Sequence, residues 1–168
     1  MNKIALVLIF LCMKSFADIS LDPKNWYPVT DNVMGGQSTL EVVAENGLFA
    51  MQGDVSTKNN GGFVRLGQDV NFQDNSIKGI QFKAKGNNET YEIHATLRGI
   101  KVPPWAYFSQ QFTVSEDWQE FKIYFNNFSA EGYSARSMKP SNIRNLSFAG
   151  YGRDFEVDLT IKDIAIIN

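Results

Sequence analysis

The side chains that could support catalysis are few in this 168-residue chain. His94 is its single histidine, and neither a G-x-S-x-G nor an H-E-x-x-H pattern occurs. A zinc site or a histidine base normally needs a second ligand or an orienting partner close by. We therefore expect His94 to be a surface or hydrogen-bonding residue of a strand, neither a catalytic base nor a metal ligand.

The carboxylates offer one regular arrangement. Asp154, Glu156 and Asp158 alternate with apolar residues, so their side chains project from one face of a strand. Neighbours on that face stand about 7 Å apart, whereas calcium holds its oxygens at about 2.3–2.6 Å. The pattern favours a solvated strand face. No metal, no cofactor and no paired acid and base are predicted, and the sequence argues against an enzyme.

Two glycine-containing stretches could in principle hold a phosphate. Asp31 to Ser38 reads DNVMGGQS, and Asn59 to Gly62 reads NNGG. A phosphate-binding loop has the spacing G-x-x-x-x-G-K-[ST] with a helix behind it. Neither stretch has that lysine or a helical pattern after it. Because Asn and Gly tolerate positive φ, both stretches are predicted to be tight turns.

An aromatic pair is the best binding candidate. Trp105 and Tyr107 follow Pro103 and Pro104 and lie two residues apart, so they point to the same side of a strand. On the solvent side they would form a shelf for a sugar ring or a protein partner. On the other side they would close the end of the core. Both alternatives stay open, and core closure is favoured.

The elements that would position these residues are strands. Apolar and polar residues alternate in segments that Gly, Asn, Asp and Pro turns separate, and neither helical periodicity nor an internal repeat occurs after residue 18. The segments are 40–42, 48–51, 80–85, 91–98, 108–114, 121–125, 146–148 and 155–161. Such a series predicts an all-β fold, an antiparallel sandwich or jelly roll of eight or nine strands.

Residues 1–17 have the pattern of a secretory signal. Lys3 precedes an apolar run from Ile4 to Met13, and Ser15 and Ala17 are the small residues expected before a signal-peptidase cut. The run is about half of the roughly 20 residues that span a bilayer. We therefore expect cleavage after Ala17 and a single domain over 18–168. The expected location is periplasmic or extracellular, with no transmembrane segment in the mature chain.

The charge and cysteine content of that mature chain exclude several classes of protein. Loss of Lys3 and Lys14 with the leader leaves 14 Lys and Arg against 18 Asp and Glu, a formal net charge of −4. A mildly acidic domain has no electrostatic footprint for nucleic acid or anionic lipid. Cys12 is the single cysteine and leaves with the leader, so no disulfide and no thiolate site are expected.

Several segments together resemble the complex I intermediate-associated protein 30 family. Trp26 is followed by TDNVMGGQS at 30–38, and GLFAMQGDVSTKNNGGFVRL occupies 47–66. The segments 91–98, 118–128 (WQEFKIYFNNF) and 143–167 resemble later strands of the same family. The resemblance covers almost the whole predicted mature chain.

The resemblance implies a galactose-binding-like β-sandwich, akin to carbohydrate-binding modules, with a non-catalytic role. Mitochondrial members are assembly factors that hold membrane-arm intermediates of NADH:ubiquinone oxidoreductase. We accordingly expect an exported, non-enzymatic protein that contacts protein partners in a chaperone-like assembly role. The alternative is glycan binding, as in a carbohydrate-binding module.

The candidate site residues fall into two sets. The structural set is Trp26, Asp31, Met34, Gly35, Gly36, Gly61 and Gly62, and the binding set is Trp105, Tyr107, Arg98, Arg65 and Asn60. Our hypothesis is that Trp26 plugs the sandwich edge, while Val33 and Met34 anchor the entry loop. The glycines would let the chain pass close to the NNGG turn, and Asp31 would pair with Arg65 or Arg98.

Overall fold

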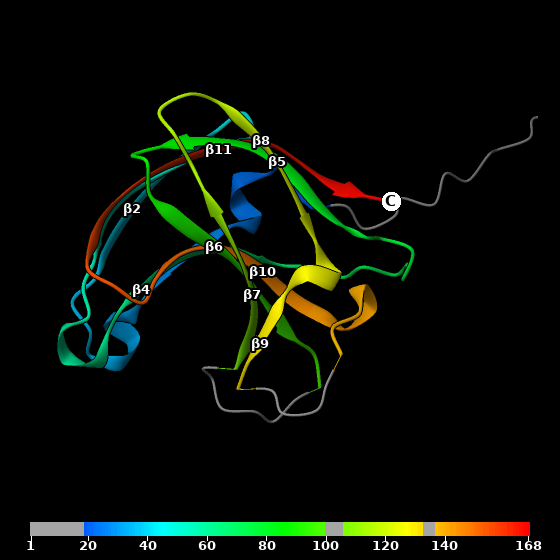
Figure 1. Ribbon diagram of the computed structural model, residues 1–168, viewed down its shortest axis with the longest axis horizontal. Coiled ribbons are helices and arrows are strands. Elements are labelled where there is room, and N and C mark those ends of the chain that lie inside the picture. The colour runs from blue at the N-terminus through cyan, green and yellow to red at the C-terminus, as the bar shows by residue number, and fades with distance from the viewer. Residues whose placement is uncertain (1–18, 100–105, 133–136) are drawn as a thin grey trace, which may run out of the picture.

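The computed structural model describes residues 19–99, 106–132 and 137–168, and these form two antiparallel sheets packed face to face (Figure 1). The six-stranded sheet has the order β1-β4-β10-β6-β7-β9, and the five-stranded sheet has the order β2-β3-β11-β5-β8. The expected all-β sandwich is confirmed. Across the described ranges, no helix has the length and apolarity that crossing a bilayer would require.

Within each sheet, several neighbouring strands come from distant parts of the chain. The six-stranded sheet contains β1 (Tyr27–Thr30), β4 (Phe63–Asp69), β10 (Ile143–Tyr151), β6 (Thr90–Leu97), β7 (Tyr107–Thr113) and β9 (Ser129–Glu131). The five-stranded sheet contains β2 (Thr39–Glu45), β3 (Leu48–Val55), β11 (Phe155–Ile167), β5 (Gly79–Gly86) and β8 (Gln119–Tyr124). Short 3₁₀ turns connect them: η1 (Pro23–Asn25), η2 (Asp31–Met34), η3 (Lys58–Asn60), η4 (Phe125–Asn127) and η5 (Pro140–Asn142).

The eleven strands of the described residues exceed the expected eight or nine, and each strand that sequence reasoning missed has a reason. β1 and β9 have four and three residues, too few for alternation to be visible. β4 is buried on both faces along most of its length, so its residues do not alternate between polar and apolar.

Aromatic side chains fill the space between the sheets. Phe82 of the five-stranded sheet meets Phe148 of the six-stranded sheet edge-on, with ring centroids 4.9 Å apart. Phe112 lies 5.1 Å from Phe82, also edge-on. Trp26 is 8% exposed, packs 4.9 Å from Phe49, and donates its indole N–H to the Ser20 carbonyl at 2.7 Å. Each such aromatic pair stabilises the fold by about 0.5–1.5 kcal/mol beyond the stabilisation that comes from burying its apolar area.

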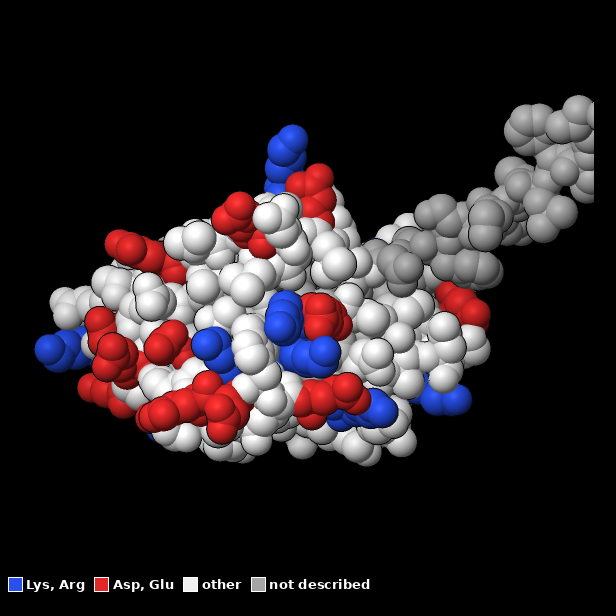
Figure 2. All heavy atoms as spheres, turned by 90° about the horizontal axis from the view of Figure 1, so that it is seen from above, with Lys and Arg blue, Asp and Glu red and all other residues white. Residues whose placement is uncertain are grey.

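Charges on the five-stranded side of the molecule are mixed. Figure 2 shows lysine or arginine side chains beside aspartate or glutamate side chains across this face. Lys83 pairs with Asp163 at 3.0 Å, and Lys122 pairs with Glu120 at 3.5 Å. No extended field of one sign covers this view, so it lacks the basic stripe that nucleic-acid binding needs.

A buried carboxylate ties the DNVMGGQS stretch to the NNGG turn. Asp31 is fully buried and accepts hydrogen bonds from the Ser38 N–H (2.9 Å), the Ser38 hydroxyl (2.5 Å), the Gly62 N–H (2.6 Å) and the Phe63 N–H (3.2 Å). Burial alone would raise the pKa of Asp31, but the hydrogen bonds from Ser38 and from the Gly62 and Phe63 N–H groups outweigh it and lower that pKa. The carboxylate is therefore ionised at neutral pH.

The expected pairing of Asp31 with an arginine is wrong. Backbone N–H groups and Ser38 supply its donors. The Arg98 guanidinium instead donates to the Ile143 carbonyl at 3.2 Å and to the Val70 carbonyl, and the Arg65 guanidinium lies over the Phe63 ring. A turn rich in free N–H groups satisfies a buried carboxylate without having to bury a second charge.

Val33 and Met34 do not anchor the loop as expected. They are 74% and 60% exposed. Hydrogen bonds to the buried Asp31 carboxylate hold the loop in place, and the glycines leave space for that carboxylate. A Cβ at Gly36 would lie 2.3 Å from the Asp31 Cγ, and a Cβ at Gly61 would lie 2.4 Å from the Asp31 Oδ2. These two glycines are therefore required by the close approach of Asp31.

We predict that Gly36→Ala lowers the free energy of unfolding by about 2–4 kcal/mol, because the new methyl group must push the Asp31 carboxylate off its buried donors. Gly35→Ala is the matched control. Gly35 has φ +86°, and no atom lies within 4 Å of the place that its methyl group would take. That variant should cost only the strain of a left-handed alanine, about 1 kcal/mol. Urea denaturation measures both, and equal losses would contradict this account of Asp31.

Candidate functional site

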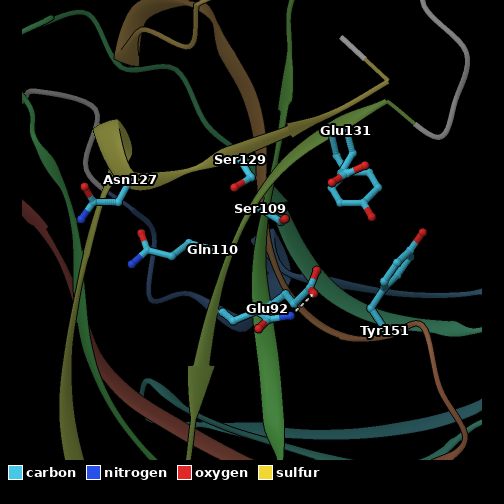
Figure 3. Close-up of a pocket in the computed structure, with 9 residues that line it drawn as sticks. Glu92, Ser109, Gln110, Asn127, Ser129, Glu131 and Tyr151 are labelled. Carbon is cyan, nitrogen blue, oxygen red and sulfur yellow. Dashed lines mark hydrogen bonds between the residues drawn. The ribbon is translucent and has the colours of Figure 1, made fainter.

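The face of the six-stranded sheet that points away from the core carries a pocket of about 590 Å³ (Figure 3). We call it the open-face pocket. It is formed by β6, β7, β9, η4 and the end of β10. Its lining residues are Glu92, Tyr107, Ser109, Gln110, Gln111, Asn127, Ser129, Glu131 and Tyr151.

Strand alternation explains why polar side chains gather on this face. On β6, Tyr91, Ile93 and Ala95 are buried in the core, so Glu92 and His94 point to the opposite side. The register of β6 with β7 sets Glu92 opposite Gln111 and His94 opposite Ser109. Figure 3 shows Gln110 and Asn127 at one side of the pocket and Tyr151 at the other.

His94 lies beneath the pocket, and of its two expected roles, surface residue or hydrogen-bonding residue, the structure shows the second. Its side chain is 1% exposed because its ring stacks on the Tyr107 ring, with centroids 4.1 Å apart and planes at 19°, and meets Tyr151 edge-on at 5.2 Å. Burial lowers the pKa of His94. The hydrogen bond with Glu92 opposes this shift, while the nearby Arg65 charge adds to it. The ring is thus neutral at neutral pH.

A neutral His94 has one donor and one acceptor. Its Nε2 lies 2.5 Å from the Glu92 Oε2, which assigns the proton to Nε2 because the ionised carboxylate can only accept. The Nδ1 atom is buried and has no hydrogen-bond partner among the described protein atoms. His94 therefore acts as a rigid support for Glu92 and Tyr107.

Glu92 is the central polar group of the pocket. Its Oε1 accepts a hydrogen bond from the Gln111 Nε2 at 3.1 Å, drawn in Figure 3, while His94 holds the other oxygen. Burial would raise the pKa of Glu92, but the hydrogen bonds from His94 and Gln111 and the Arg65 charge lower it. An ionised carboxylate of this kind accepts hydrogen bonds and does not serve as a general acid.

Arg65 lies beside the pocket without lining it. Its guanidinium carbon is 4.5 Å from the Phe63 ring centroid and 5.8 Å from the Tyr107 ring centroid. Burial lowers the pKa of Arg65, and Glu92 and the two tyrosines oppose that shift. Its Nε is buried without a hydrogen-bond partner among the described protein atoms. The arginine charge thus offsets part of the Glu92 charge from behind Tyr107.

The structure separates the residues that the sequence placed in one binding set. Tyr107 is 6% exposed, yet it lines the pocket, and Arg65 lies next to it. Arg98 holds backbone carbonyls, and Asn60 is an exposed residue of η3 with φ +60°. Trp105 lies outside the described residues.

Of the nine lining residues, sequence reasoning found Tyr107 and missed the other eight, among them Glu92, Gln111, Glu131 and Tyr151. The alternation that placed Tyr91 and Ile93 in the core already put Glu92 on the outer row, and Gln111 precedes the buried Phe112 in the same way. Strand alternation could not identify Tyr151 and Glu131 as pocket residues, because they reach the pocket from distant segments of the chain. Within the described ranges, no three His, Cys, Asp or Glu side chains are grouped so that they could hold a metal ion.

We predict a loss of stability on mild acidification that His94 controls. Its folded pKa is lowered below the unfolded value of about 6.5, so the unfolded chain takes up the proton first. The free energy of unfolding should be fully present above about pH 6.5 and fall below it, by up to about 1.4 kcal/mol per pH unit. Urea titrations from pH 8 to 5 measure this slope, which His94→Gln should flatten. An unchanged slope in that variant would contradict the assignment.

Comparisons with known proteins agree with this fold. The chain matches the family model described as complex I intermediate-associated protein 30 over residues 15–161. A comparison with curated protein sequences finds no match. Among solved structures, the family 11 carbohydrate-binding module of the cellulosomal cellulase Lic26A-Cel5E of Clostridium thermocellum has a TM-score of 0.63 at 16% identity, covering 86% of this chain and 88% of the module.

Two further structures show the same likeness. The Clostridium thermocellum family 11 module in complex with a β-1,3-1,4-mixed-linked tetrasaccharide has a TM-score of 0.63 at 15% identity, over 90% of this chain and 95% of the module. An agarase has a TM-score of 0.60 at 9% identity, with 89% of this chain matching 24% of the enzyme. At such identities these likenesses establish the fold alone. The family match, which spans most of the chain, shows that this protein belongs to the complex I intermediate-associated protein 30 family.

Proposed function

We propose that this protein is an exported, non-catalytic binding domain that takes a hydroxyl-rich, sugar-like ligand in the open-face pocket. The observation that carries the proposal is the combination of two tyrosines, Tyr107 and Tyr151, with a lining of amide, hydroxyl and carboxylate groups. Sugars present apolar ring faces and many hydroxyls, so they suit a site that offers both. Export rests on the leader pattern of residues 1–17.

The geometry supports binding more than reaction. Glu92 is locked by His94 and Gln111 and keeps its charge, so it can accept hydroxyl protons in hydrogen bonds but does not donate one to a leaving group. The aromatic wall of the pocket is also rigid, because the Tyr107 ring stacks on the His94 ring. A preorganised aromatic and acceptor surface lowers the entropy cost of binding. Family 11 carbohydrate-binding modules share the fold, which is consistent with this use.

We predict that Tyr151→Ala weakens binding of a neutral oligosaccharide about tenfold, since it removes one aromatic wall while leaving the strands intact. The measurement is calorimetric titration with neutral tetrasaccharides, the β-1,3-1,4-mixed-linked one among them. Tyr124→Ala, which truncates a half-buried tyrosine of the five-stranded sheet, is the control and should bind normally. If wild-type protein binds no neutral oligosaccharide, the proposal fails.

A second candidate function is protein binding in an assembly role, as the family name suggests. The observation that favours it is the exposure of Val33 and Met34. These apolar side chains project from a turn that the Asp31 hydrogen bonds hold fixed. A fixed apolar pair on a surface loses little entropy when a partner covers it, which favours an anchoring contact.

For this candidate we predict that the double substitution Val33→Ser/Met34→Ser abolishes capture of a specific partner without loss of stability. Exposed side chains contribute little to folding, so the free energy of unfolding should change by less than about 0.5 kcal/mol. Affinity capture from the native envelope or medium, followed by mass spectrometry, compares this variant with wild type. Val43→Ser removes an equally exposed valine of β2 as the control. A partner retained by the double variant would contradict the role of this turn.

A further inference from the structure

The described lining of the open-face pocket is rich in hydrogen-bond acceptors. Glu92 and Glu131 contribute carboxylates, which when ionised can only accept. The Gln111 amide, by contrast, already donates to Glu92. The serine and tyrosine hydroxyls can donate as well as accept, so the two carboxylates give the described lining its excess of acceptors.

The charges that the described residues place around the pocket are negative on balance. Glu92 and Glu131 are carboxylates, Arg65 brings one positive charge from behind the Tyr107 ring, and His94 is neutral and buried. The described lining holds no lysine and no arginine. Of the two carboxylates, Glu92 is already engaged by His94 and Gln111, whereas Glu131 on β9 is exposed. A ligand cation would meet Glu131, and a ligand anion would be repelled by it.

The tyrosine walls suit the same kind of group. Tyr107 and Tyr151 lie 5.5 Å apart between ring centroids, with their planes at 66°. Aromatic rings set at an angle beside carboxylates attract ammonium groups through their electron-rich faces. The excess of acceptors, the negative charge and the aromatic walls therefore all favour a ligand with a protonated amino group.

We propose that the open-face pocket prefers a sugar unit carrying a free amino group over the same unit in its N-acetylated or carboxylated form. The protonated amine brings three donors and one positive charge to a pocket whose described lining holds two carboxylates and neither lysine nor arginine. This inference rests on the proposed sugar-binding function. It assigns Glu131 as the residue that sets the preference, with Glu92 as the fixed acceptor beneath it.

The test compares three short oligosaccharides of similar length by calorimetry: oligoglucosamine, its fully N-acetylated form, and oligogalacturonate, at a pH where the amine is protonated. We expect oligoglucosamine to bind about fivefold more tightly than the N-acetylated form, and oligogalacturonate to bind most weakly. Glu131→Gln should bring the affinities for the first two within about twofold of each other, because it removes the charge that the amine meets. Glu131 is exposed, so this variant should remain folded.

Glu41→Gln is the matched control, because it removes another exposed carboxylate, from β2 of the other sheet, and changes the net charge by the same amount. It should keep the full preference. A preference lost equally in both variants, or kept in Glu131→Gln, overturns the assignment of Glu131. Equal binding of the aminated and N-acetylated forms by wild type overturns the inference and leaves the sugar-binding function standing. Binding of no oligosaccharide, neutral ones included, overturns both.

Discussion

The buried Asp31 carboxylate is the interaction on which the rest of the structure depends. It accepts four hydrogen bonds from Ser38, Gly62 and Phe63 and so joins the chain entering β2 to the chain entering β4, one strand in each sheet. A buried charge is stable only when its donors are fully arranged around it. The glycines at 36 and 61 follow from this, since any side chain there would occupy the space of the carboxylate.

A second constraint concerns the six-stranded sheet, which has a different environment on each face. One face packs aromatic and aliphatic side chains against the five-stranded sheet. The other face carries a polar layer in which His94 supports both Tyr107 and Glu92. Because strand alternation sends every second residue to each face, the core residues of β6 dictate the positions of the pocket residues. Packing on one side thereby makes the pocket on the other side rigid.

The two candidate functions use different parts of this framework. The open-face pocket depends on β6, β7, β9 and the end of β10, whereas Val33 and Met34 project from η2, a turn that leads into β2. Both surfaces rest on rigid supports, the first on the His94 ring and the second on the Asp31 carboxylate. Preorganisation of this kind serves recognition, because the ordering cost is met during folding.

Local periodicity was enough to predict the all-β class and most of the long strands, because alternation along a strand directly reflects burial of one face. Short strands such as β1 and β9, and the doubly buried β4, carry no such pattern. The family resemblance could likewise be read from the DNVMGGQS stretch, but the partner of Asp31 could not, since N–H groups are the same in every residue except proline. Tertiary structure alone decided that His94 is buried and that Glu92, Glu131 and Tyr151 meet in one pocket. These residues come from different strands, and only the pairing of those strands brings them together.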